Sequence, residues 1–187
     1  AVVGDAGKCI SPPYDVIDED LQQQLYDQNE HNIVRLIQGK KKESDNREDN
    51  EYTRAAKSLN DWISEEALKQ DDKDTIYAYV QDFALGSETV RRSGFVALGK
   101  LEAFGGKVQP HEKTLDGPKA DRLNLMRATK AQLGQIFMLY DDPQQVADAI
   151  IAKAAQGEPV VEYTDDIEGV THKLFTIQDP DEISAIE

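Results

Sequence analysis

Two pairs of β-forming segments, each closed by a polar turn, constrain the fold of this 187-residue chain more than any other feature. The first pair, 75–85 and 93–104, flanks a turn at 86–88, and the second pair, 160–163 and 170–177, flanks an acidic turn. Strands joined by short turns pair in the antiparallel direction. The pattern therefore predicts a sheet built mainly from hairpins.

Helical patterns lie between and beside these hairpins. From 51 to 68 the apolar residues recur at helical spacing, which places Trp62 on a buried face. Asp18 is expected to cap a helix that ends near residue 27, and Pro143 to open another that ends near residue 156. Asp179 followed by Pro180 carries the signature of a further helix start.

Two short apolar runs and one basic segment complete the expected elements. The runs 33–37 and 135–140 are rich in β-formers and are predicted as short strands. The segment 115–131 is predicted to be a loop leading into a helix that carries Leu123 and Met126 inward. Because hairpins dominate over alternating strand–helix units, we expect an α+β fold with a mixed, largely antiparallel sheet and flanking helices.

Length and composition are those of a globular protein. With 39% hydrophobic and 30% charged residues, we expect a single α+β domain over residues 1–187, interrupted by a polar, poorly ordered loop at about 40–50. The sequence contains no run near the roughly 18 apolar residues that a membrane span needs, and no secretory signal. The single cysteine, Cys9, fits the reducing cytoplasm, so we expect a cytoplasmic protein.

Both ends of the sequence suggest a longer protein. Ala1 is not an initiator methionine, and the helix that starts after Asp179 has room for only about two turns before Glu187. We therefore expect this chain to be the N-terminal part of a larger protein, with the C-terminal half as its partner.

The charge distribution points to a small anionic ligand. The net charge is −15, which argues against a general nucleic-acid surface, because neutralising phosphates supplies most of that affinity. The segment 107–130 is the exception, with six basic residues against three acidic ones. We call this segment the basic island.

The residue types in the basic island would work together on a phosphate. Lys113, Lys119 and Arg122 can neutralise phosphate oxygens, and Thr114 belongs to the same expected phosphate-binding set. Backbone N–H groups at the start of the helix add a further anion site. The adjacent pair His111 and Glu112 offers acid–base chemistry near neutral pH. The competing interpretation is a solvated helix face with ordinary ion pairs.

A metal site is not expected from the sequence. The three histidines are far apart in the sequence, and none forms a paired ligand spacing with another histidine or with Cys9. Most isolated histidines are surface residues or hydrogen-bonded core residues. We therefore assign no metal-ligating residue.

Six segments together resemble one protein family in their order and spacing. They are SPPYDVI (11–17), NIVRL (32–36), RSGFVAL (92–98), PHEKT (110–114), KADRLNLMRAT (119–129) and IFMLY (136–140). This set resembles the bacterial and archaeal family known as domain of unknown function 1015, over nearly the whole chain. The resemblance marks Asp15 and Arg35 as second-rank site candidates, together with Arg127 in the longest segment.

The resemblance also implies a wider relationship. Members of the family are about twice as long and carry, beyond this stretch, a segment similar to the phosphate-handling motif of the ParB/sulfiredoxin superfamily. That superfamily includes nucleotide hydrolases, a sulfinic-acid reductase and free-serine kinases, so this relationship implies phosphate chemistry without fixing a reaction.

Three functional hypotheses follow. The first is a nucleotide- or phosphate-binding domain of a small-molecule phosphotransferase using ATP with magnesium, in which Lys113, Lys119 and Arg122 hold phosphate while His111 and Glu112 position or deprotonate an acceptor hydroxyl. The second is a non-enzymatic regulatory module that binds a phosphometabolite or nucleotide without turnover. The third is purely structural, with the basic island forming ion pairs to acidic parts of the protein.

Overall fold

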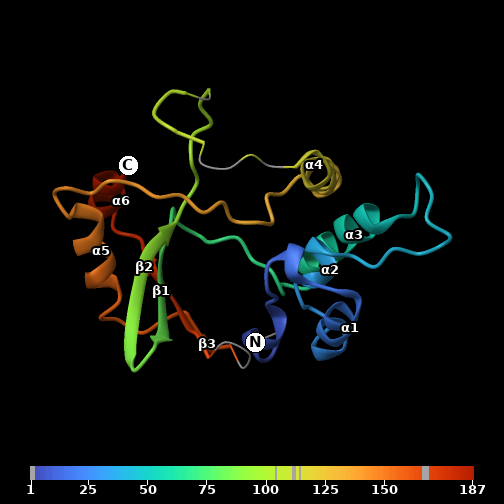
Figure 1. Ribbon diagram of the computed structural model, residues 1–187, viewed down its shortest axis with the longest axis horizontal. Coiled ribbons are helices and arrows are strands. Elements are labelled where there is room, and N and C mark those ends of the chain that lie inside the picture. The colour runs from blue at the N-terminus through green and yellow to red at the C-terminus, as the bar shows by residue number, and fades with distance from the viewer. Residues whose placement is uncertain (1–2, 104, 111–112, 114, 166–168) are drawn as a thin grey trace. The chain divides into compact units, whose positions relative to one another are not determined.

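The two predicted hairpins join into one antiparallel sheet in the computed structural model (Figure 1). The structure describes residues 3–103, 105–110, 113, 115–165 and 169–187. The chain forms two compact units, each drawn from two stretches of sequence. Unit 1 comprises Ala1–Lys69 and Lys100–Gln135, and unit 2 comprises Gln70–Gly99 and Ile136–Glu187.

Unit 2 contains the sheet. Its strands are β1 (Ile76–Leu85), β2 (Glu88–Val96), β3 (Val161–Thr164) and β4 (Thr171–Ile177). They lie in the order β2-β1-β4-β3, and each neighbouring pair is antiparallel. With the six α-helices of the described chain, this arrangement confirms the predicted α+β class and its largely antiparallel sheet.

The first hairpin is tighter than predicted. Gly86 adopts a φ of 64°, a conformation that glycine accepts without a steric cost, and the chain reverses so sharply that Leu85 pairs with Glu88. The second strand therefore begins at Glu88 and ends at Val96. The predicted strand at 93–104 was wrong at both ends: the tight turn moves the start of pairing to Glu88, and pairing with β1 ends where Val96 meets Tyr77.

One face of the sheet carries the core of unit 2. Side chains alternate between the faces of a strand, so Ile76, Ala78 and Val80 point to the same side, where they are buried with Phe175 and Ile177. The helices α5 (Val146–Ala154) and α6 (Pro180–Ile186) cover this face (Figure 1), with Ile151 of α5 buried in it. As predicted, the Asp179 side chain caps α6, accepting from the N–H of Asp181 at 2.9 Å.

Unit 1 is helical. Its described residues form two 3₁₀ turns and four α-helices: η1 (Ala6–Cys9), η2 (Tyr14–Val16), α1 (Glu19–Gln28), α2 (Val34–Ile37), α3 (Glu51–Ser64) and α4 (Asp116–Thr129). The predicted cap of α1 is confirmed, because the Asp18 side chain accepts from the N–H of Leu21 at 2.8 Å. The predicted burial of Trp62 on α3 is also confirmed, and its neighbour Ile63 is exposed.

The predicted strand at 33–37 was wrong, because this segment forms the helix α2. Asn32 is fully buried, and its side-chain oxygen accepts from the N–H of Val34 at 3.0 Å, which favours a helical turn. Its side-chain nitrogen donates to the carbonyl oxygens of Lys8 and Ile10. Side chains two residues apart point to opposite sides of a helix, so Val34 is buried with Ile17 and Leu25 while Leu36 is buried with Leu59 and Trp62.

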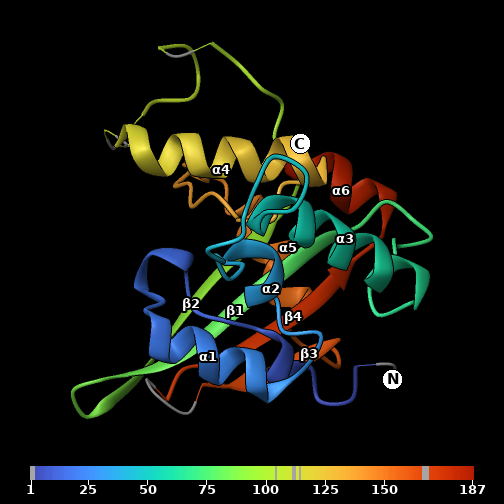
Figure 2. The same cartoon turned by 90° about the vertical axis from the view of Figure 1, so that its right-hand side faces the viewer.

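The inward face of α4 also differs from the prediction. Leu125 is buried, whereas Leu123 and Met126 are 44% and 41% exposed. α4 lies beside α3 (Figure 2), and Asp121, one helical turn before Leu125, accepts a hydrogen bond from Tyr52 of α3. The helix has apolar residues on more than one side, so its sequence alone did not determine the buried face.

The predicted strand at 135–140 was wrong as well. Residues 135–140 form no strand, and the apolar side chains from Ile136 to Leu139 are exposed. Two of the segment's rings contact β2, since Tyr140 packs edge-on against Phe95 and Phe137 lies 5.9 Å from the Arg92 guanidinium. Side-chain contacts therefore replace the backbone pairing that the sequence suggested.

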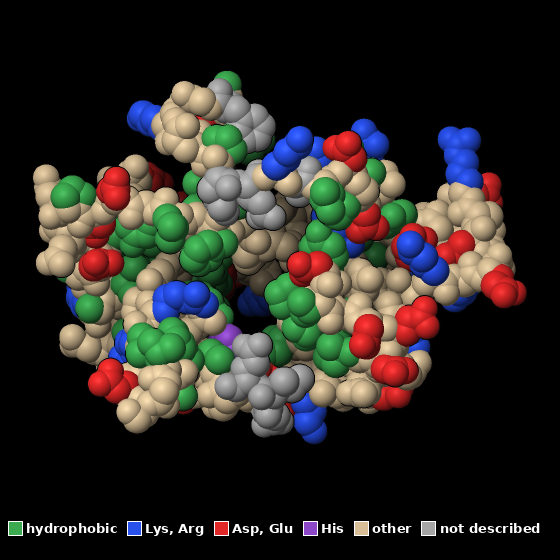
Figure 3. Space-filling view, viewed as in Figure 1, with side chains coloured by type: hydrophobic (Ala, Val, Ile, Leu, Met, Phe, Trp, Pro, Cys, Tyr) green, Lys and Arg blue, Asp and Glu red, His purple; other side chains and the backbone are tan. Residues whose placement is uncertain are grey.

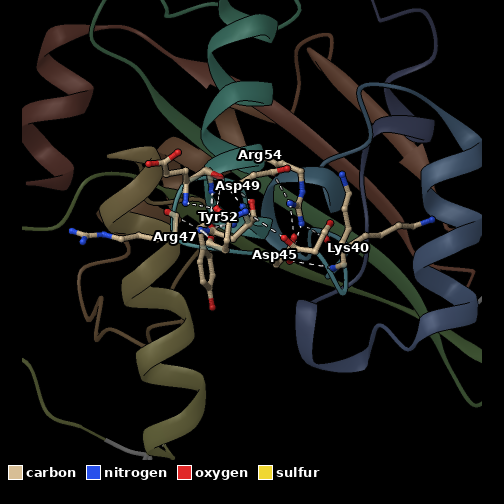
Figure 4. Close-up of polar contacts among 12 residues, drawn as sticks. Lys40, Asp45, Arg47, Asp49, Tyr52 and Arg54 are labelled. Carbon is tan, nitrogen blue, oxygen red and sulfur yellow. Dashed lines mark hydrogen bonds and ion pairs between the residues drawn. The ribbon is translucent and has the colours of Figure 1, made fainter.

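The polar loop at 40–50 has no helix or strand, as predicted, but it is held by an internal network (Figure 4). Arg54 of α3 donates to both carboxylate oxygens of Asp45 at 2.7 and 3.0 Å, to Asp49 at 2.7 Å and to the Lys40 carbonyl at 2.8 Å. These bonds raise the pKa of Arg54 above its usual value. A single arginine thus gathers the acidic side chains of the loop, whereas the sequence suggested little order.

None of the described helices has the length and hydrophobicity required to cross a bilayer.

Candidate functional site

The structure describes only part of the basic island. His111, Glu112 and Thr114, predicted from the sequence as acid–base and phosphate-binding residues, lie outside the described residues. Lys113, Lys119, Arg122 and Arg127 are described, as are the second-rank candidates. The part of the basic island whose contacts can be described is therefore mainly the helix α4.

The helix α4 begins at Asp116 without a side-chain cap, because Leu115 occupies the N-cap position. Pro118 at the third helical position has no N–H. The backbone N–H groups of Asp116 and Gly117 are therefore the first-turn donors that a ligand could use at this helix end. The helix ends at Thr129, and the C-cap residue Lys130 has a φ of 57°, which reverses the backbone, while its N–H donates to the Met126 carbonyl at 2.8 Å.

Arg122 is the centre of a four-residue cluster in unit 1. Its Nε donates to Oδ2 of Asp121 at 2.8 Å, and its Nη2 donates to the same oxygen. Its guanidinium lies 4.1 Å from the centre of the Tyr14 ring. The other oxygen of Asp121 accepts from the Tyr52 hydroxyl at 2.7 Å. We call Tyr14, Tyr52, Asp121 and Arg122 the arginine cluster.

Three separate segments supply the arginine cluster. Tyr14 comes from η2, where Pro12 and Pro13 fix an extended approach to the turn. Tyr52 comes from the first turn of α3, where Asn50 forms a capping box with Thr53. Figure 4 shows Tyr52 pointing away from the loop network. Two of the segments that carry the family resemblance, 11–17 and 119–129, therefore meet here.

Burial and hydrogen bonding set the electrostatics of the arginine cluster. Burial alone would raise the pKa of Asp121, but hydrogen bonds from Tyr52 and Arg122 outweigh it and hold the pKa below its usual value. Burial, followed by the bond to Asp121, raises the pKa of Tyr52 to about 12. At neutral pH the tyrosine is therefore a hydroxyl donor and the aspartate a carboxylate.

One amino group of Arg122 remains available. Within the described part of the chain, Nη1 makes no hydrogen bond, and the arginine side chain is 28% exposed. A guanidinium carries five N–H donors, so those that Asp121 does not use can bind an added anion. The arginine cluster thus presents a guanidinium that is held in place on one side and open on the other.

The other basic residues are less constrained. Lys119 forms an ion pair with Asp116 at 2.9 Å, but the lysine side chain is 55% exposed and the aspartate fully exposed. Such a pair holds its partners weakly. Lys113 and Arg127 are exposed. The structure therefore places Lys119 and Arg122 on the first two turns of α4, without joining Arg127 to the arginine cluster.

The second-rank candidates Asp15 and Arg35 belong to different local environments. Asp15 is exposed and follows Tyr14 directly in η2. Arg35 lies over the Tyr26 ring at 4.2 Å and donates to the Tyr26 carbonyl at 2.8 Å. Its Nε is buried without a hydrogen-bond partner among the described residues. Neither residue has a described hydrogen bond to the arginine cluster.

Sequence reasoning missed three members of the arginine cluster. Tyr14 and Asp121 lie inside segments that carry the family resemblance, but neither was selected as a site residue. Tyr52 belongs to the helically spaced residues of 51–68, and that spacing indicates packing rather than a polar contact. A tyrosine at the end of an apolar stripe, where the hydroxyl can reach a polar partner, was the available signal.

Among the described residues, no group of three or more His, Cys, Asp or Glu side chains is arranged to hold a metal ion.

Comparison with known proteins places the chain in a family. The model of the family described as "Protein of unknown function (DUF1015)" matches residues 2–187. The chain belongs to this family. The resemblance noted in the sequence is confirmed over almost its full length, whereas the family description assigns no activity that could be transferred. No curated protein and no solved structure matches the chain.

Proposed function

We propose that unit 1 binds a phosphate-bearing small molecule or nucleotide at the first two turns of α4. The observation that carries this proposal is the state of Arg122, whose Nε and Nη2 are anchored by Asp121 while Nη1 is unoccupied within the described residues. Anchoring lowers the entropy that the side chain loses on binding. A guanidinium prepared in this way suits a phosphate group better than a freely moving lysine does.

Neighbouring groups add to the expected affinity. Lys119 lies one turn before Arg122, and its exposed ion pair with Asp116 exchanges readily for a ligand phosphate. The uncapped N–H groups at the start of α4 favour negative charge through the helix dipole. Asp121 opposes a multiply charged anion, so we expect magnesium to strengthen the binding of ATP by screening its phosphates.

The reaction that we place on this binding step is phosphoryl transfer to a small acceptor. His111 and Glu112 would position or deprotonate the acceptor hydroxyl, and Lys113 and Thr114 would contact phosphate, as the sequence suggests. The proposed relationship to the ParB/sulfiredoxin superfamily favours this chemistry. A regulatory module that binds the same ligand without turnover is the second candidate, favoured because the described residues of the cluster provide binding contacts only.

Calorimetric titration of ATP, with and without magnesium, tests the binding step. We expect Arg122→Gln to weaken binding by about tenfold or more, equivalent to about 1.4 kcal/mol, and Arg127→Gln to leave it unchanged. Arg127 lies on the same helix, is exposed and is a matched loss of one positive charge. Equal affinity in the wild type and Arg122→Gln would overturn the proposal and leave a structural role for the arginine cluster.

Turnover separates the two candidate functions. With ATP, magnesium and a panel of small hydroxyl acceptors, a phosphotransferase would consume ATP, and His111→Ala would lower this rate more than the affinity for ATP. Binding that persists without any ATP consumption would instead support the regulatory module.

A further inference from the structure

A second cluster of polar and aromatic side chains lies on the face of the sheet opposite α5 and α6. Because side chains alternate along a strand, Tyr79, Gln81 and Phe83 of β1 point away from the core formed by Ala78 and Val80. Strand register brings three more side chains to this face. Arg92 of β2 and His172 of β4 both pair with Gln81, one from each neighbouring strand. Tyr163 of β3 pairs with His172.

His172 is held between two tyrosine rings. The ring of Tyr79 stacks on it with centroids 6.0 Å apart, and that of Tyr163 stacks with centroids 6.5 Å apart. Its Nδ1 lies 2.6 Å from the Tyr79 hydroxyl oxygen and 3.4 Å from Nε2 of Gln81. Cross-strand neighbours at these separations fix the orientation of a ring on a sheet surface.

The orientation of Gln81 assigns the histidine tautomer. The amide oxygen of Gln81 accepts two hydrogen bonds from Arg92, from Nε at 2.8 Å and from Nη2 at 2.6 Å. The amide nitrogen of Gln81 therefore faces His172 and can only donate. Nδ1 of His172 must then be the acceptor, so the neutral ring carries its proton on Nε2. Within the described part of the chain Nε2 makes no hydrogen bond, so the ring keeps this N–H for a ligand.

Arg92 is anchored in the same manner as Arg122. Gln81 holds its Nε and Nη2, and within the described residues Nη1 makes no hydrogen bond. Its guanidinium lies 6.0 Å from the Phe83 ring centre and 5.9 Å from that of Phe137. Aromatic rings at this distance stabilise a cation weakly without neutralising it. The full positive charge of Arg92 therefore remains available.

These side chains border a hollow of about 350 Å³. Its lining combines polar and apolar residues: Gln81, Phe83, Ala84, Arg92, Val170 and His172. The volume lies at the lower end of the range of small-molecule sites, which is roughly 300–1,000 Å³. Figure 3 shows basic and hydrophobic side chains near a histidine on the surface of unit 2, which contains this hollow.

We propose that this hollow is a binding site for a small organic carboxylate with an aromatic or other apolar body. One guanidinium and one neutral imidazole N–H match the single charge of a carboxylate, and the planar guanidinium matches its geometry. A phosphate would bring up to two charges, whereas Arg92 is the one cation among the described residues that line the hollow. The apolar side of the lining, Phe83, Ala84 and Val170, would cover the hydrocarbon part of the ligand.

Nuclear magnetic resonance of the histidine side chains tests this site directly. The chain has three histidines, and comparison with the spectrum of His172→Gln assigns the signal of His172. We expect a neutral ring protonated on Nε2, and a saturable shift of that signal on titration with benzoate. Benzamide, the uncharged analogue, and inorganic phosphate should leave the signal in place. No shift with benzoate, or an equal shift with either control, would overturn the proposal.

Neighbouring arginines on opposite faces of β2 provide matched variants. Arg92→Gln should lower the affinity for benzoate by at least about tenfold, the scale of one charge-assisted contact. Arg91→Gln should not change it, because Arg91 forms its ion pair with Asp82 on the other face. Equal affinity in the wild type and Arg92→Gln would contradict the assignment. Because benzoate and ATP address different units through different arginines, this test can fail while the proposed function stands, and the reverse also holds.

Discussion

The guanidinium of Arg122 lies 4.1 Å from the centre of the Tyr14 ring, which joins the turn η2 to the second turn of α4. The ring supports one face of the guanidinium, while Asp121 holds one edge in the guanidinium plane. These two constraints orient the group without using all of its donors. The ligand-binding role that we propose for Arg122 depends on this relationship.

Replacing Tyr14 by leucine should destabilise unit 1 through loss of this contact. We expect a decrease of roughly 0.5–2 kcal/mol in the free energy of unfolding, the range for a cation over an aromatic ring. Chemical denaturation measures the change. Tyr14→Phe keeps the ring and should retain wild-type stability. A leucine variant as stable as the phenylalanine variant would show that the stacking contributes nothing.

The stability of unit 1 should depend on the protonation of Asp121. Because hydrogen bonds from Tyr52 and Arg122 outweigh burial and hold the pKa of Asp121 below its usual value of 3.8, the folded state binds its proton less tightly than the unfolded state does. The stabilisation is therefore complete above pH 3.8 and is lost as the pH falls through the lower folded-state pKa.

Denaturation between about pH 2 and pH 6 checks this dependence. Asp121→Asn should lower stability at pH 6 and show a weaker loss of stability in acid. Asp116→Asn, which removes a fully exposed carboxylate from the same helix, should follow the wild-type profile. Identical profiles for the two variants would contradict the assigned role of Asp121.

Tyr52 should produce the opposite dependence at alkaline pH. Burial and the bond to Asp121 raise its pKa to about 12, so its contribution to stability is complete below pH 10 and is lost as the pH rises through about 12. Tyr52→Phe should remove the hydrogen bond, at a cost of about 1–3 kcal/mol at neutral pH, and flatten this alkaline loss. Tyr14→Phe is the control for loss of a phenol. An unchanged alkaline profile in Tyr52→Phe would disprove the pairing.

Arg54 should control the order of the polar loop at 40–50. Arg54→Gln removes the donors that hold Asp45, Asp49 and the Lys40 carbonyl, so amide hydrogen exchange across 40–50 should become faster. Arg47 extends away from this network in Figure 4, and Arg47→Gln should leave exchange unchanged. Similar exchange in the two variants would show that the loop keeps its order by other means.

Local signals allowed much of the fold to be predicted. The hairpins follow from β-forming runs around polar turns, and α1, α3 and α6 follow from capping residues and helical spacing. The prediction for 33–37 was wrong because the hydrogen bonds of the Asn32 side chain and the burial of Leu36 decide the conformation of this segment. Both depend on residues distant in the sequence.

The arginine cluster shows that local sequence signals are also limited in predicting a site. The sequence singled out Arg122 by its charge and its place near a helix start. The ring of Tyr14 and the hydroxyl of Tyr52 reach it only through the packing of unit 1, which a local pattern does not specify. Asp121 is adjacent in sequence, but an adjacent acid on a helix does not generally face its neighbour.

The most direct test of the central claim is to observe the Nε–H signal of Arg122 by nuclear magnetic resonance while ATP and magnesium are added to the wild-type chain. The signal, assigned by its absence in Arg122→Lys, should shift saturably, while the corresponding signal of Arg127 stays in place. A signal of Arg122 that does not move, or that moves only as much as that of Arg127, would contradict a phosphate site at this arginine.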